Sequence, residues 1–131
     1  MNDLIFKGYA IKDFIFENKT LQNEHCDVEL ENNFFAQVNY SEDDTQCVCD
    51  FKVELIDKNN SDPLIHIILE ILASFSHPSN MDKQILHAEI CNSIYPYARM
   101  IISSFTANAG ISPIFIASVD FTGAKPVDNN L

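Results

Sequence analysis

The chain has 131 residues, of which 8 are Lys or Arg and 19 are Asp or Glu, so its formal net charge at pH 7 is −11. A chain of this length is expected to form one domain over residues 1–131, and its apolar fraction of 47% argues against wholesale disorder. Nucleic acids and anionic membranes attract patches of Lys and Arg. The acidic balance, with Arg99 as the only arginine, therefore argues against both as partners.

The sequence carries no recognisable signal for export or for membrane insertion. Near the N-terminus an acidic residue, Asp3, precedes an apolar run of only three residues, which does not make a signal peptide. The longest apolar stretch, residues 64–75, includes His66 and Glu70 and is too short and too polar to span a bilayer. We therefore expect a cytoplasmic protein whose four cysteines are reduced thiols.

Two of the cysteines, Cys47 and Cys49, are separated by one residue, so on a strand both sulfurs face the same side. This spacing is not that of a redox or zinc motif, and we expect two small buried side chains. His25 stands beside Cys26, but the sequence has no second ligand pair at zinc spacing. We therefore expect no metal site.

The first half of the chain has the residue alternation of β-strands separated by polar turns. We expect strands at residues 9–17, 28–40, 47–56 and 64–75, joined as an antiparallel meander. In the first strand, Phe14 and Phe16 share one face, while Asp13 and Glu17 share the other. The last strand is apolar on both faces, which predicts a central position in the sheet or cover on both sides.

The second half of the chain changes to helical periodicity. Residues 81–91 are compatible with a helix, and a stronger helix is predicted over 92–110, capped by Asn92 or Ser93 and with Pro96 in its first turn. Gly110 is placed to end this helix in a left-handed conformation. Its apolar stripe consists of Ile94, Ala98, Ile101, Phe105 and Ala109.

The apolar surface of this helix is wider than one stripe, because Tyr97, Met100 and Ile102 extend it. A helix of this kind is either deeply buried or shared with another subunit. An extended apolar segment is expected over residues 111–121, and residues 121–131 are expected to form a flexible tail.

No catalytic constellation is apparent in the sequence. The chain has only three glycines and no glycine-rich phosphate loop, and it contains no hydrolase, metalloprotease or kinase motif. His66 lies on an otherwise apolar strand, where a structural role is expected. The residues alone therefore predict an acidic α+β domain that is not an enzyme and that needs no cofactor.

Four short segments resemble the SecB family of export chaperones. They are Lys12–Glu17 (Lys-Asp-Phe-Ile-Phe-Glu), Ser93–Arg99 (Ser-Ile-Tyr-Pro-Tyr-Ala-Arg), Ala107–Ile116 and Val119–Phe121. The resemblance implies an α+β fold in which a four-stranded antiparallel sheet is followed by a long helix, assembling as a homotetramer that is a dimer of dimers. It also implies an ATP-independent holdase that binds unfolded polypeptides in hydrophobic grooves and serves Sec-dependent export.

The resemblance also suggests which residues carry these functions. In the family, acidic residues on the outer sheet face bind the translocase motor SecA, and the matching positions here are Asp13 and Glu17. Groove residues for unfolded clients and contacts between subunits are expected at two further sets of positions. These are Val28, Leu30, Phe34 and Phe121 for the groove, and Tyr97, Ile101, Ile102 and Phe105 for the oligomer interface.

Two departures from the family pattern keep an alternative open. The segment Val119-Asp-Phe lacks the usual Asn, and ten residues follow Phe121 where well-studied members continue into a second helix. The alternative is a dedicated SecB-like adaptor for one partner, such as an antitoxin, without a SecA role. The identity of the clients stays open in both interpretations.

Overall fold

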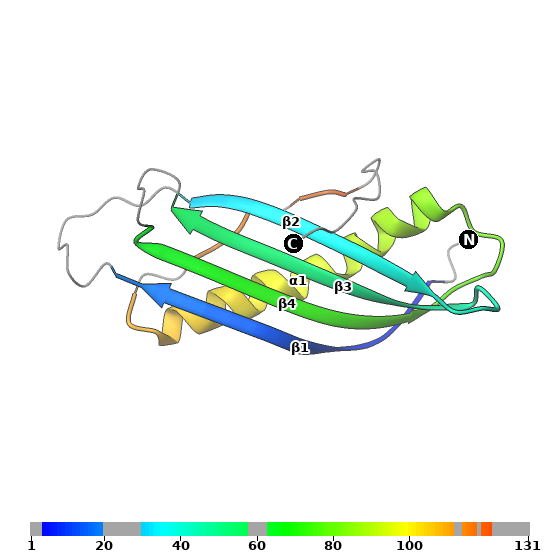
Figure 1. Cartoon of the computed structure of the whole chain (residues 1–131), viewed down its shortest axis with the longest axis horizontal. Helices are drawn as coiled ribbons and strands as arrows, with labels where there is room; N and C mark the ends of the chain where they lie inside the picture. The colour runs from blue at the N-terminus through cyan, green and yellow to red at the C-terminus, as the bar shows by residue number, and fades with distance from the viewer. Residues whose placement is uncertain (1–3, 20–29, 58–62, 112–113, 118, 122–131) are drawn as a thin grey trace.

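The computed structural model describes residues 4–19, 30–57, 63–111, 114–117 and 119–121. Within these ranges an antiparallel sheet is followed by a helix that crosses one of its faces (Figure 1). The elements are β1 (Ile5–Asn18), β2 (Leu30–Tyr40), β3 (Gln46–Asp57), β4 (Ile65–Ser76) and α1 (Lys83–Asn108). The predicted fold class, a four-stranded antiparallel sheet followed by one long helix, is confirmed.

The strand order is β1-β4-β3-β2, so the predicted four-strand meander is only partly correct. β2, β3 and β4 form a meander, but β1 pairs with β4 at the far side and not with β2. In a full meander β4 would lie at an edge, although its sequence is apolar on both faces. In the observed order β4 pairs with β1 on one side and with β3 on the other. It therefore has the central position that its composition predicts.

Two irregularities in β1 change which of its side chains face the helix. The register with β4 shifts between Phe6 and Gly8 and again between Ile11 and Asp13. Gly8 has a φ of +138°, a conformation that residues with a Cβ rarely adopt. As a result Phe6, Tyr9 and Phe14 all lie on the helix side, although their positions do not share one parity.

The core lies between the sheet and α1. The helix-facing side chains of β3 and β4 are almost completely buried, and α1 covers them with a line of buried residues at four-residue spacing. The line on α1 consists of Leu86, Ile90, Ile94, Ala98, Ile102 and Thr106. It keeps Ile94 and Ala98 of the predicted stripe, but Ile101 and Phe105 lie beside it and are part-exposed.

α1 is one continuous helix of 26 residues, so the predicted break near residue 92 is wrong. Asp82 caps its start, where the carboxylate accepts hydrogen bonds from the backbone N–H groups of Gln84 and Ile85. Pro96 lies inside the helix, on its exposed side. Burial of the apolar line on both sides of Pro96 outweighs the one helical hydrogen bond that proline cannot make.

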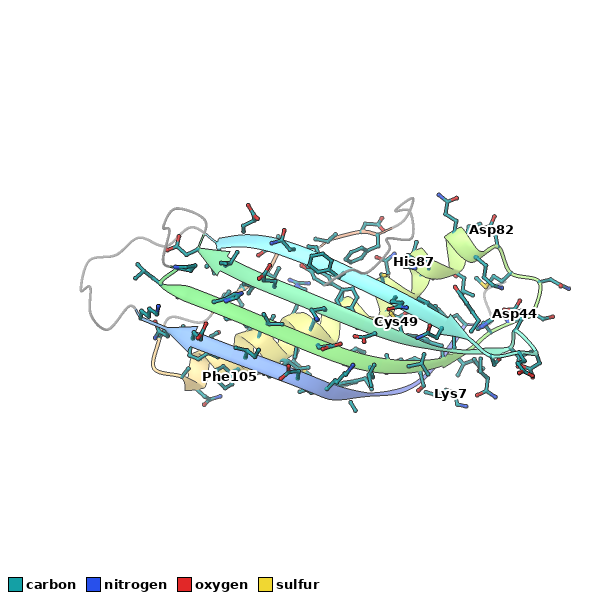
Figure 2. The ribbon with its side chains drawn as sticks, viewed as in Figure 1. Lys7, Asp44, Cys49, Asp82, His87 and Phe105 are labelled. Carbon is teal, nitrogen blue, oxygen red and sulfur yellow. The ribbon has the colours of Figure 1, made fainter. Side chains whose placement is uncertain are left out.

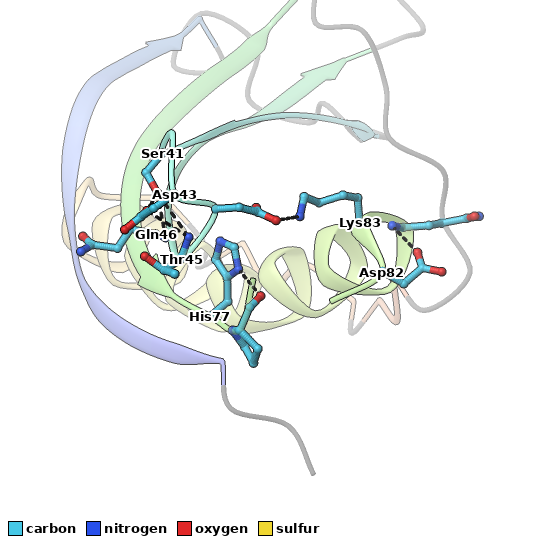
Figure 3. Close-up of polar contacts among 10 residues, drawn as sticks. Ser41, Asp43, Thr45, Gln46, His77, Asp82 and Lys83 are labelled. Carbon is cyan, nitrogen blue, oxygen red and sulfur yellow. Dashed lines mark hydrogen bonds and ion pairs between the residues drawn. The ribbon is translucent and has the colours of Figure 1, made fainter. Parts of the chain in front are cut away.

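Gly110 follows the helix with a φ of +83°, which confirms the predicted left-handed ending. At the other end, the turn between β2 and β3 is fastened to the helix start (Figure 3). Lys83 Nζ lies 2.6 Å from Asp44 Oδ2 and 4.9 Å from the centre of the Tyr40 ring. These contacts join the first turn of α1 to the end of the sheet, from which the helix crosses the sheet obliquely (Figure 1).

No helix in the described part of the chain is both long enough and apolar enough to cross a membrane. Three parts of the chain named in the sequence analysis lie outside the described residues: the predicted groove residue Val28, the neighbouring pair His25 and Cys26, and the predicted tail after Phe121.

Candidate functional site

Two acidic side chains of β1 lie on the outer face of the sheet, which is turned away from α1. Asp13 and Glu17 are exposed on this face, with the part-exposed Ile15 between them, as the sequence predicts. Because they are four residues apart on one strand, their Cα atoms are separated by about 13 Å. The register places Glu70 of β4 directly beside Asp13, a third carboxylate that the sequence pattern did not indicate.

A network of ion pairs occupies the middle of the outer face. Lys12 Nζ lies 3.6 Å from Asp50 Oδ2 and 3.4 Å from Glu70 Oε2, and Lys52 Nζ lies 3.9 Å from Glu70 Oε1. Burial raises the pKa of Asp50, and its hydrogen bond to Glu70 raises it further. The same hydrogen bond lowers the pKa of Glu70. Asp13 and Glu17 flank the network.

His66 lies between two carboxylates at one end of this face. Its Nε2 is 2.8 Å from Glu54 Oε2, and its Nδ1 is 3.7 Å from Glu17 Oε1. An ionised carboxylate only accepts hydrogen bonds, so the ring donates to Glu54. His66 therefore has the structural role expected from the sequence, since it joins β1, β3 and β4.

The edge of α1 next to β1 is an open aromatic surface, which we call the β1 flank. Its rings contact one another in pairs: Phe105 lies 4.6 Å from Phe14 and 5.0 Å from Phe16, and Tyr97 lies 5.0 Å from Tyr9 between ring centres. Figure 2 labels Phe105 at the end of α1 beside β1. The β1 flank comprises Phe6, Tyr9, Ile11, Phe14, Phe16, Tyr97, Ile101 and Phe105.

Much of the β1 flank remains accessible in the single chain. Ile11 is 47% exposed and Phe105 is 39% exposed, and Tyr97 and Ile101 are half-buried. Three of the four predicted interface residues thus lie on an open apolar surface. The fourth, Ile102, is fully buried in the core of the single chain, which leaves it no atoms to offer a second subunit.

The opposite edge of α1 is closed by an aromatic cluster, which we call the β2 flank and which consists of Phe34, Phe51, Tyr95 and Phe121. The Phe121 ring lies 5.8 Å from Phe34, 5.5 Å from Tyr95 and 6.1 Å from Phe51 between ring centres. The rings meet edge to face, a favourable arrangement for aromatic pairs. Two predicted groove residues, Phe34 and Phe121, are thus in contact, and Leu30 packs on the core at the same side of the sheet.

Phe121 belongs to an extended segment, described at residues 114–117 and 119–121, that runs back along α1. The backbone N–H of Ile114 donates to Thr106 Oγ1 at 2.8 Å, and Arg99 Nε donates to the carbonyl of Ile116 at 2.9 Å. The Tyr95 hydroxyl donates to the carbonyl of Ala117.

Asn92 makes two further hydrogen bonds with this segment. Its Nδ2 donates to Asp120 Oδ1 at 3.1 Å, and its Oδ1 accepts from the backbone N–H of Phe121 at 2.8 Å. Sequence reasoning predicted an extended segment here, but it assigned Asn92 to a helix cap and did not predict these contacts. A hollow of about 320 Å³ remains beside the segment, lined by Pro96, Arg99, Met100, Ser103, Phe115 and Ile116.

The described cysteines are structural. Cys47 and Cys49 are buried on the same face of β3, as predicted, and Cys91 of α1 is buried near them and unbridged. Burial raises the pKa of Cys47 to about 11 and that of Cys91 to about 12, so these thiols are protonated at neutral pH. In the described ranges no three His, Cys, Asp or Glu side chains are grouped so as to hold a metal ion.

Comparison with known proteins gives consistent matches. The family model of SecB, described as preprotein translocase subunit SecB, matches residues 4–124. The protein-export protein SecB of Bartonella quintana (strain Toulouse) is 28% identical over 119 residues, which span 85% of this chain and 74% of that protein.

A solved structure matches the fold. It is the Mycobacterium tuberculosis Rv1957 SecB-like chaperone in complex with a ChAD peptide from the Rv1956 HigA1 antitoxin. The TM-score is 0.68, with 13% sequence identity, and the match covers 88% of this chain and 90% of that one. At this identity the likeness establishes the arrangement of strands and helix that the two chains share.

Proposed function

Because this chain belongs to the SecB family, we propose that it is an ATP-independent cytoplasmic chaperone that holds unfolded polypeptides and keeps precursors competent for Sec-dependent export. The family match over residues 4–124 carries the proposal, since it spans both the sheet and the helix. The protein needs no nucleotide for this role, because binding and release of a client exchange one set of apolar contacts for another.

The open apolar surface supports a protein that works through contacts with other chains. Contiguous exposed apolar patches mark interaction sites. We propose that part of this surface, through Tyr97, Ile101 and Phe105, joins subunits into a homotetramer that is a dimer of dimers. The negative charge keeps such an assembly soluble, because like charges oppose further association.

Client binding is proposed at the β2 side of the molecule. β2 is an edge strand of the described sheet, so its outer backbone groups are available to pair with an extended chain. Leu30 and Phe34 line this side, and Val28 precedes them in the sequence. Burial of client side chains there stabilises the complex by about 25 cal/mol per Å² of apolar surface.

The direct test is suppression of aggregation. The protein is mixed at increasing ratio with several unrelated proteins diluted from denaturant, and light scattering is followed without nucleotide. We expect protection of all of them at about one chaperone assembly per client. If no client is protected at excess chaperone, the holdase proposal fails.

The same titration separates the dedicated adaptor. An adaptor protects one partner, such as an antitoxin segment, and leaves the unrelated proteins to aggregate. The solved complex of the SecB-like chaperone with an antitoxin peptide makes this peptide chemistry the natural single-partner probe.

The proposed SecA contact rests on the exposed acids of β1. Asp13→Lys with Glu17→Lys should weaken binding to purified SecA by at least tenfold, because the exposed acids would become cations. The matched control is Glu31→Lys with Glu42→Lys, an equal charge change at exposed positions away from β1. Equal affinity of the two double variants for SecA would refute the contact, and mass measurements establish that neither variant changes assembly.

A further inference from the structure

The segment 114–121 is bound to α1 as a ligand would be, mainly through its backbone. Tyr95, Arg99, Thr106 and Asn92 each make a hydrogen bond with a backbone group of the segment, and Asn92 makes a further one with the side chain of Asp120. Every polypeptide carries the same carbonyl and N–H groups. A row of helix side chains that recognises them therefore accepts chains of many sequences.

The dimensions of the contact are those of an extended chain. From Thr106 back to Asn92 the helix covers about 21 Å at 1.5 Å per residue. The bound segment covers a similar length between Ile114 and Phe121, at about 3 Å per residue. It therefore lies nearly straight and antiparallel to α1.

The side chains of residues 114–117 also alternate between bound and exposed positions. Ile116 is buried, and the Phe121 ring fills the space between Phe34, Phe51 and Tyr95. Phe115, between buried Ile116 and Ile114, which packs on the core, is 76% exposed.

We propose that residues 114–121 are a built-in competitor in the proposed client groove beside α1, which an extended apolar segment of a client polypeptide must displace. This inference rests on the proposed chaperone function and adds a regulation of the client groove to it. The predicted groove residue Phe121 is then an occupant of the groove, whereas Phe34 is part of its wall. Apparent client affinity is reduced by the fraction of molecules in which the segment is bound.

The test uses a fluorescent synthetic peptide with the sequence of residues 114–121 as probe. Phe121→Ala removes the ring that anchors the built-in segment, so we expect the probe to bind this variant about tenfold more tightly than the unaltered protein. Phe115→Ala is the matched control, because Phe115 belongs to the same segment but points to solvent. We expect its affinity for the probe to change less than twofold.

A double variant establishes where the probe binds. With the competitor already weakened by Phe121→Ala, adding Phe34→Ala removes the groove wall and should reduce probe affinity about tenfold. If Phe121→Ala does not raise affinity, or if Phe34→Ala has no effect in that background, the proposal is overturned.

Hydrogen exchange tests the same idea without any substitution. The backbone amides of Ile114 and Phe121 donate to Thr106 and Asn92, so the bound segment protects them from exchange. At saturating probe we expect this protection to be lost while the amides in the middle of α1 keep theirs. Unchanged protection of both segment amides at saturation would show that the built-in segment is not displaced.

The outcome is separable from that of the chaperone proposal. If the protein suppresses aggregation but probe affinity is the same in Phe121→Ala, the competitor is refuted and the chaperone function stands. If the probe binds Phe121→Ala more tightly but no unfolded protein is protected, the groove stands and the chaperone function fails.

Discussion

Aromatic rings line both long edges of α1, but the two edges differ in how far other parts of the chain cover these rings. On the β2 flank, Phe34, Phe51 and Tyr95 are closed over by Phe121 from the same chain. On the β1 flank, Phe105 and Tyr97 pack on rings of β1, yet Phe105 and Ile11 stay substantially exposed. The chain itself thus covers the aromatic rings of the β2 flank, whereas apolar surface of the β1 flank stays exposed. Aromatic content alone therefore does not tell a core from an interface.

The largest expected effect is a loss of stability when a buried ring of the β2 flank is removed. Phe51 is buried beneath Phe34 and Phe121, so Phe51→Ala should lower the free energy of unfolding by about 3–5 kcal/mol. Phe105→Ala, on the open flank, should cost roughly 1 kcal/mol in dilute protein and more at high concentration, because the proposed association would bury this side chain. Urea unfolding at two protein concentrations measures both. A Phe105→Ala cost that does not depend on concentration would contradict the difference between the flanks.

The next effect concerns assembly. Tyr97→Asp with Phe105→Asp places two charges on the β1 flank, and an interface cannot bury unpaired charges without a large desolvation cost. We expect the mass in solution to fall from that of a tetramer to that of a dimer or of a single chain of 14.8 kDa, as measured by light scattering. Val48→Asp with Ile85→Asp serves as control, since both are exposed apolar residues away from this flank. An unchanged mass in the first pair would remove the β1 flank from the interface.

A smaller effect is expected from pH. Cys47, Cys49 and Cys91 are buried on the helix side of the molecule, and β1 contains no cysteine. Burial raises the pKa of each thiol above its usual value near 9, to about 11 for Cys47 and about 12 for Cys91. The folded state therefore keeps its thiol protons where the unfolded state loses them, so stability falls as the pH rises above about 9.

The contribution of the thiols is isolated by substitution. Cys91→Ala should make the loss of stability between pH 9 and pH 11 shallower, while the stability at neutral pH falls through loss of packing. The measurement is thermal or urea unfolding as a function of pH. An identical alkaline slope in the variant would show that Cys91 does not contribute to it.

The strands could be predicted because alternation with period two is local, but their order could not. No pattern in the sequence of β1 predicts that it pairs with β4. The signal that was available lies in β4 itself, whose two apolar faces conflict with an edge position. The parity of Asp13 and Glu17 was correctly predicted because no register shift lies between them, whereas Tyr9 lies beyond one and changes face.

The helix and the site show the same limit. Pro96 near two good capping residues indicates a helix start, but the buried line through Ile94 and Ala98 continues the helix across it. Glu70 joins Asp13 only through strand pairing, which local patterns do not encode. The contacts of residues 114–121 are mostly to backbone atoms, and backbone atoms are the same in every sequence.

The position of β1 at the edge next to β4 has a consequence for how the protein is made. During synthesis Ile5–Asn18 leaves the ribosome before its partner Ile65–Ser76, with about 50 residues between them. At roughly 5–20 residues per second, this apolar strand waits for several seconds without its neighbour. Until β4 has emerged, β1 has no strand to pair with, so the growing chain exposes an apolar segment of the kind that we propose the finished protein binds.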